Sequence, residues 1–327
     1  MNVKNVSFKL RWWFKEHMYF SRNLLSNEVT MEYNMPLGYT DFAVHPCVRY
    51  VNIGSGVDGW WMVLTPYAGY NNKIENILLY HGVDGDETTP STKWIFVKEV
   101  CGTHEQGYNS DPCLFFDGKN LEVYWRECFT ENVTKASNGR CIMCSKTTDG
   151  VIFSSPQVVA TNLYNEYQSV GDSVMCPIVM SYKGVITMYA SIYQFQPYLK
   201  PLGVARYVGS TDLFSFDGFQ KRTSNGFDLW HFDMFEYNGY LYQIVTGQQG
   251  NAIFIGRSDD GKIFKYSKRP LYFYPFFLKK NFFYKATAQV VGGKLFVFFP
   301  RLVSDGRLRV VMRSMDVGCL ESKFKYE

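Results

Sequence analysis

The chain has 327 residues, which is enough for one large or two ordinary domains with a sizeable core. Hydrophobic residues make up 46% of the chain and charged residues 20%, which excludes a disordered or collagen-like polymer. Aromatic residues reach 18% and only nine residues are alanine, so the composition favours β-sheets over helices.

The charges are nearly balanced, with 34 Lys and Arg against 30 Asp and Glu and a net charge of +4. The basic residues are scattered, which argues against a nucleic-acid partner. No stretch approaches the roughly 18 apolar residues of a membrane helix, so we expect no membrane insertion. Charges interrupt residues 1–13 and no cleavage site follows, so we expect synthesis in the cytoplasm without a signal peptide.

The eight cysteines are expected to be reduced thiols, because the sequence has no export signal. Cys141 and Cys144 form a lone C-x-x-C motif. A zinc site needs a second pair, and a redox motif needs a βαβ context, whereas this neighbourhood resembles a hairpin. We therefore expect two packed strand cysteines, no metal and no cofactor.

Five segments share one pattern, in which a tight turn that ends in Gly precedes an aromatic or β-branched strand. These strands cover residues 60–64, 121–125, 185–189, 241–245 and 295–299. Their starts are 61, 64, 56 and 54 residues apart by subtraction, which gives each unit room for four strands. The pattern predicts an all-β fold, a single five-bladed β-propeller. The alternative is a two-sheet sandwich, in which five similar units are hard to place.

The chain divides into an N-terminal arm and the propeller. Residues 41–327 contain the repeats and form one predicted propeller domain. Residues 1–40 lie outside the repeats and are rich in aromatic side chains. They either close the ring or dock on a partner, and the sequence leaves both alternatives open.

Aligning the units on their first turn reveals a shared position at the start of each first strand. His45, Asp111 and Cys176 occupy it in the first three units, and each precedes a proline. Counting back from the turn places His231 and Lys285 there in the last two units. The innermost strand of every propeller blade faces the central channel, so these residues are expected to converge at one end of the ring.

The motifs of the first two units indicate a family resemblance. The chain reads His45-Pro46, then WWMVLTPY at 60–67, then Glu75-Asn76, followed by NSDP at 109–112 and YWR at 124–126. In this order they resemble the first two blades of five-bladed propellers related to glycoside hydrolase families 43 and 32. The resemblance spans about residues 40–316 and is loose outside the first two blades.

The resemblance implies a sugar pocket at one end of the ring, with carboxylates acting as acid and as base or nucleophile. Asp111 and Asp233 are the two candidate catalytic carboxylates, and Asp41 is a weaker third. Two departures argue against catalysis. The hydrolases usually carry Asp where this chain has His45, and no Glu stands near Cys176, where the general acid is expected.

The candidate substrate-binding residues are His45, Asn109, Arg126, His231, Tyr284 and Lys285. Each also has a purely structural interpretation. His45 would then bond nearby backbone, Asp111 would form a turn, and Arg126 and Lys285 would pair with acids. His231 and Asp233 are two apart and point the same way on a strand, which fits either a shared site or an internal hydrogen bond.

Two classes of function follow. The first is a carbohydrate-recognising, glycosidase-like propeller that binds a glycan or polysaccharide and either hydrolyses it or only holds it. The second is a non-catalytic structural or receptor-binding subunit of a phage tail or other virion, whose residues 1–40 contact other subunits. Whether the chain is an enzyme stays open at this point.

Overall fold

The computed structural model describes residues 24–26, 28–52, 54, 56–68, 71, 74–102, 107–129, 140–161, 172–194, 200–221, 231–246, 251–267, 269–274 and 283–320. These residues form five antiparallel sheets, so the predicted all-β, five-bladed propeller is confirmed and the sandwich is wrong. Within this part of the chain, no helix is long and apolar enough to cross a membrane.

Three blades follow one another from the N-terminal side, each as a four-stranded sheet. Blade 1 consists of β2 (Ala43–Val51), β3 (Gly59–Pro66), β4 (Leu78–Gly82) and β5 (Trp94–Glu99). Blade 2 consists of β6 (Gly107–Phe116), β7 (Leu121–Phe129), β8 (Arg140–Thr147) and β9 (Gln157–Thr161). Blade 3 consists of β10 (Asp172–Tyr182), β11 (Val185–Gln194), β12 (Lys200–Ser210) and β13 (Leu213–Lys221).

The last two blades differ in their outer strands. Blade 4 consists of β14 (His231–Tyr237), β15 (Tyr240–Thr246), β16 (Ala252–Ser258), β17 (Lys265–Tyr266) and β18 (Tyr272–Phe273), which also pairs with β16. Blade 5 consists of β19 (Thr287–Val291), β20 (Lys294–Leu302), β21 (Leu308–Asp316) and the N-terminal β1 (Val29–Thr30). In β1, Val29 pairs with Met312 and Thr30 with Val311. The fifth sheet therefore combines a strand from the N-terminal part of the sequence with three strands from its C-terminal part.

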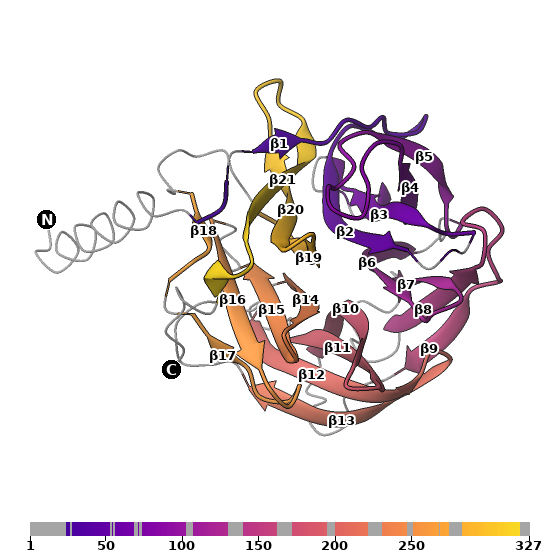
Figure 1. Cartoon of the computed structure of the whole chain (residues 1–327). Helices are drawn as coiled ribbons and strands as arrows, with labels where there is room; N and C mark the ends of the chain where they lie inside the picture. The colour runs from indigo at the N-terminus through magenta and orange to yellow at the C-terminus, as the bar shows by residue number, and fades with distance from the viewer. Residues whose placement is uncertain are drawn as a thin grey trace, which may run out of the picture.

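The first strands of the blades form the inner circle of the ring. β2 contacts β6, β6 contacts β10, β10 contacts β14, β14 contacts β19, and β19 contacts β2. Figure 1 shows these five strands nearest to the central axis and β1 beside β21. Residues at the start of the inner strands therefore approach one another, although they are far apart in the sequence.

The hairpin turns and the core follow from the residues that the sequence places there. Lys183-Gly184, Asn238-Gly239 and Gly292-Gly293 all have positive φ at both positions, the geometry that a two-residue turn between twisted strands requires. Large aromatic side chains fill the space between blades, and Trp60, Tyr124 and Phe298 are at most 1% exposed. Cys141 and Cys144 are buried free thiols on β8, as predicted.

Neighbouring inner strands are joined by a repeated hydrogen bond from a backbone N–H to a side chain. Leu114 N donates to Cys47 Sγ at 3.2 Å and Val179 N to Cys113 Sγ at 3.5 Å. Ala288 N donates to Asp233 Oδ2 at 3.0 Å, and Val48 N to Thr287 Oγ1 at 3.3 Å. We call these four contacts the inter-blade hydrogen bonds. They join blade 1 to 2, 2 to 3, 4 to 5 and 5 to 1.

Candidate functional site

The shared position before proline is a bulge with unusual backbone geometry. The φ angles are 52° at His45, 56° at Asp111 and 52° at Cys176. These values lie in the left-handed region, which residues other than Gly rarely adopt. At each one the pairing with the next strand shifts by one residue, between Val44 and Cys47 in blade 1 and at the matching places in blades 2 and 3. A bulge redirects the side chain that it carries and often lies beside an active site.

Asp111 is fully buried and lies at the centre of a group of polar side chains. We call Asp111, His45, His231, Arg126 and Glu75 the cluster. Its Oδ1 lies 3.2 Å from His45 Nε2 and 3.8 Å from His231 Nδ1. Its Oδ2 forms an ion pair with Arg126 Nε at 3.0 Å and accepts a hydrogen bond from Cys176 N at 3.3 Å. The inner strands of blades 1, 3 and 4 therefore each contribute a group to the carboxylate that the inner strand of blade 2 carries, and Arg126 adds a charge from β7.

Burial and charge set the protonation states of this cluster. Burial alone would raise the pKa of Asp111, but the charges around it, Arg126 foremost, hold that pKa well below its usual range. Burial lowers the pKa of His45 to about 3, against the attraction of Asp111, and lowers the pKa of His231 well below its usual value. At neutral pH the cluster therefore contains a carboxylate and two neutral imidazoles.

One tyrosine lies against the two imidazoles, and a second tyrosine lies against the first. The ring centroid of Tyr284 is 4.7 Å from that of His45 and 5.0 Å from that of His231. Tyr67 lies 5.8 Å from Tyr284, and both tyrosines are only partly buried. Exposed aromatic rings beside buried polar groups are a common arrangement for binding sugar rings.

Glu75 is a second carboxyl group at the cluster, and sequence reasoning did not assign it a catalytic role. Its Oε2 lies 4.0 Å from His45 Nδ1, and the residue is 4% exposed. Burial raises the pKa of Glu75 to about 8, with Ser110 and Arg126 acting in the opposite direction. The segment between β3 and β4 that carries Glu75 has no regular periodicity, so the sequence offered no signal beyond the Glu75-Asn76 motif.

Lys285 and Asn109 connect the segments around the site through hydrogen bonds. Lys285 Nζ donates to Pro112 O at 2.8 Å and is fully buried, so it fixes the bulge of blade 2 against blade 5. Asn109 Nδ2 donates to Asn76 Oδ1 and to Gly102 O, both at 3.1 Å, while its Oδ1 accepts from Trp125 Nε1. Asn109 therefore ties the chain around Glu75 to blade 2.

The structure does not bring Asp233 into contact with His45 or Asp111. Its carboxylate accepts hydrogen bonds from Arg49 at 2.6 and 2.9 Å, from Thr287 Oγ1 at 2.5 Å and from Ala288 N at 3.0 Å. These partners come from blades 1 and 5. Asp233 lies two residues along β14 from His231, but its oxygens are occupied by the inter-blade contacts.

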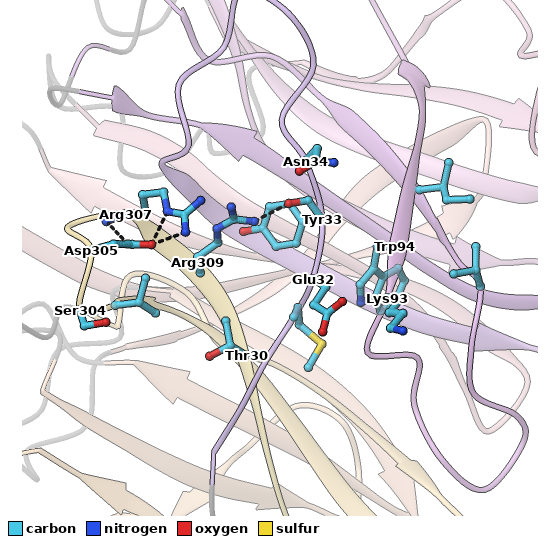
Figure 2. A pocket seen from close by; sticks show the side chains of 14 residues that line it. Thr30, Glu32, Tyr33, Asn34, Lys93, Trp94, Ser304, Asp305, Arg307 and Arg309 are labelled. Carbon is cyan, nitrogen blue, oxygen red and sulfur yellow. Dashed lines mark hydrogen bonds and ion pairs between the residues drawn. The ribbon is translucent and has the colours of Figure 1, made fainter.

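Asp41 lies in a different place again, beside the outer parts of blades 1 and 5. Its carboxylate forms ion pairs with Arg309 and, at 3.0 Å, with Arg307. Both arginines line a groove of about 590 Å³ between the N-terminal segment, blade 1 and blade 5. Figure 2 shows Arg307 with Asp305 on one side of this groove and Trp94 with Lys93 on the other. Asp41 therefore pairs with two arginines of this outer groove and, among the described residues, forms no ion pair or hydrogen bond with His45, Asp111 or His231.

One subset of the cluster has the composition of a metal site. The donor atoms of His45, Asp111 and His231 all lie within 4.8 Å of one another, and all three residues are buried. Among the residues that the structure describes, Glu75, Arg126 and the buried Lys285 are charged or ionisable groups that act on this group.

Comparison with solved structures identifies the class of fold. An N-acetylgalactosamine deacetylase from F. plautii, solved with blood group B trisaccharide, matches 90% of this chain and 96% of its own, with a TM-score of 0.68 and 13% identity. The β-xylosidase RS223 matches 84% and 91% of the two chains, with a TM-score of 0.59 and 14% identity. A family 43 glycoside hydrolase from Xanthomonas citri matches 91% and 92%, with a TM-score of 0.59 and 11% identity.

These matches confirm the predicted resemblance to the five-bladed propellers of carbohydrate-active enzymes. Identities of this size establish the shared fold. No known family's sequence profile matches the chain, and no curated protein sequence matches it either. The chain is therefore a five-bladed propeller with a glycosidase-like fold.

Proposed function

We propose that this protein binds a glycan at the end of the ring where His45, Asp111 and His231 meet, and hydrolyses a bond in it. One observation carries the proposal. Blades far apart in the sequence deliver two imidazoles, two carboxyl groups and two tyrosine rings to one place. A structural ion pair needs far fewer convergent groups, whereas a binding site for a polar ligand needs several.

The chemistry of the cluster suits a sugar. Tyr67 and Tyr284 are partly exposed and offer flat apolar faces, while the carboxylates and imidazoles offer acceptors and donors to hydroxyl groups. The three structural neighbours named above are, by their descriptions, a carbohydrate deacetylase, a xylosidase and a glycoside hydrolase. A carbohydrate ligand is the simplest reason for the shared architecture.

Hydrolysis requires a group that transfers a proton, and Glu75 is positioned to supply it. The glycosidases that the sequence resembles use a pair of carboxyl groups. The chain has no Glu near Cys176, where the resemblance places the general acid. Glu75 approaches the same cluster from the segment after β3. We assign Glu75 as the proton-transfer residue and Asp111 as the anchor that positions the imidazoles.

A panel of polysaccharides and oligosaccharides, scored for binding and for released product, tests this function. Wild type is expected to bind at least one glycan and to cleave it. Asp111→Asn is expected to lose binding, and Glu75→Gln to keep binding but lose about 10²- to 10⁴-fold in turnover. Asp212→Asn is the matched control, because the Asp212 carboxylate is exposed and pairs with Lys146, which is not a member of the cluster. Equal binding by wild type and Asp111→Asn would remove the proposed site.

The alternative function is a structural or receptor-binding virion subunit, with a virion location and partners contacted through residues 1–40. This alternative rests on the sequence of the arm, of which residues 1–23 lie outside the described part of the chain. A stoichiometric partner that is lost on deleting residues 1–23, together with no glycan cleavage, would favour it.

A further inference from the structure

The geometry points to a divalent transition-metal cation, zinc or a close relative, bound by His45, Asp111 and His231. The sequence had given no reason to expect a metal, because these residues are 66 and 120 positions apart by subtraction. The fold places their donor atoms within 4.8 Å of one another. The inference concerns the same cluster as the proposed function, and any role of the cation in hydrolysis rests on that function.

The distances fit a small ion. Asp111 Oδ1 lies 3.2 Å from His45 Nε2 and 3.8 Å from His231 Nδ1. A tetrahedral zinc ion with bonds of about 2.0 to 2.2 Å holds its ligands roughly 3.3 to 3.6 Å apart. The two separations from Asp111 are close to this spacing, while the whole donor set spans up to 4.8 Å, so the imidazoles must move closer together for all three atoms to reach one ion.

The surrounding contacts orient the donor atoms. Thr65 Oγ1 lies 2.9 Å from His45 Nδ1, so a hydrogen bond there leaves Nε2 to face Asp111. Arg126 and Cys176 N occupy Asp111 Oδ2, which leaves Oδ1 directed at the imidazoles. Metal-binding histidines and carboxylates are typically held by such outer contacts, which fix the ring orientation.

The donor types select the cation. Two imidazoles and one carboxylate suit zinc, iron, cobalt or manganese, and three protein ligands leave a position open for water or substrate. Calcium and magnesium prefer oxygen donors throughout. Arg126 also partly neutralises Asp111, so most of the affinity must come from the imidazoles. We therefore expect zinc-like ions to bind far better than calcium or magnesium.

The backbone at two of the three ligands supports a role beyond packing. His45 and Asp111 have φ angles of 52° and 56°. A residue other than Gly held in the left-handed region is energetically unfavourable, and such residues gather at functional sites. Glycine would adopt the same backbone more easily, so the presence of His and Asp at these positions agrees with a role for their side chains.

The test uses the metal alone, without a glycan. Protein stripped with EDTA is titrated with Zn²⁺ and Co²⁺ by calorimetry, and bound metal is counted by mass spectrometry after dialysis. Ca²⁺ and Mg²⁺ are titrated in parallel. The variants are Asp111→Asn and His231→Gln, and His81→Gln is the matched control on β4, outside the cluster. Circular dichroism and thermal melts establish that each variant is folded.

The expected result is about one Zn²⁺ per chain in wild type and in His81→Gln, with binding weakened at least about tenfold in the two cluster variants. Absorption bands of Co²⁺ bound to nitrogen and oxygen should appear in wild type and disappear in His231→Gln. Equal zinc binding by all four folded proteins, no zinc binding by wild type, or a thiolate-to-cobalt absorption band would each overturn the proposal. The last result would place the metal on the cysteines. Metal binding without glycan cleavage would contradict the proposed function and leave the metal site standing.

Discussion

The inner strands of blades 1 to 3 differ from those of blades 4 and 5 at one position. In blades 1 to 3 a residue before proline forms a bulge with positive φ, and the strand pairing shifts by one residue. β14 and β19 pair with their neighbours without any shift. The bulged blades deliver His45 and Asp111 to the cluster, whereas Asp233 and Thr287 in the regular blades make inter-blade hydrogen bonds. Blade 4 supplies His231 to the same cluster, and Cys47 and Cys113 in the bulged blades also accept inter-blade hydrogen bonds. The two groups of blades therefore differ in the backbone that carries the cluster residues: His45 and Asp111 lie on bulges, whereas His231 lies at the regular start of β14.

The largest effect on stability is expected from Asp233→Asn in regular blade 4. Arg49 would keep its charge and lose its carboxylate partner inside the protein. Breaking one side of a buried ion pair costs about 3 to 5 kcal/mol. Urea denaturation should show that loss, while Asp212→Asn, whose side chain is 68% exposed and pairs with Lys146, should lose less than about 1 kcal/mol. Equal losses in the two variants would mean that Asp233 has no special structural role.

A smaller loss is expected from Thr287→Val in blade 5. The hydroxyl accepts from Val48 N and from Arg49 Nη1 and donates to Asp233, and valine fills the same volume without these bonds. Leaving a buried N–H without its acceptor costs about 1 to 3 kcal/mol. Thr187→Val is the control, because Thr187 is about equally buried and its hydroxyl, within the described part of the chain, donates to the nearby Val185 O on the same blade. A control that loses as much as Thr287→Val would argue against the inter-blade bond.

At the bulge of blade 1, glycine should be a better replacement than alanine. His45 has a φ of 52°, which glycine adopts freely and alanine does not. In EDTA, His45→Gly is therefore expected to be more stable than His45→Ala by about 1 kcal/mol, measured as free energy of unfolding in urea. An alanine variant that matches or exceeds the glycine variant would show that the bulge rearranges.

At His231 alanine should be a better replacement than glycine, because this residue begins β14 and does not have a positive φ. There glycine weakens the strand relative to alanine by roughly 0.5 to 1 kcal/mol. His231→Gly is thus expected to be less stable than His231→Ala under the same conditions. The same preference at both histidines would remove the distinction between bulged and regular blades.

The sequence predicted the fold because its signals were local. Gly-containing turns such as Asn238-Gly239 fix hairpins within a few residues, and their spacing gave five blades. Aligning the units on their turns also grouped His45, Asp111 and His231, because a repeated strand start maps to a repeated place in the ring.

The rest depended on contacts between blades, which the sequence does not encode locally. Arg49 faces away from its own blade to pair with Asp233, and that pairing separates Asp233 from the cluster. Glu75 reaches the cluster from an irregular segment whose path no pattern predicts. Asp41 lies only four residues before His45, yet it pairs with arginines of blade 5 at an outer groove.

The pairing of β1 with β21 has a consequence for how the protein is made. Val29 is synthesised long before Met312, its partner in blade 5, so the fifth sheet cannot be completed until nearly the whole propeller has been translated. Until then β1 has an unpaired strand edge, and contacts this distant in sequence form slowly. The final step of biogenesis is thus the meeting of the earliest strand with the latest, and chaperones would have most to protect just before it.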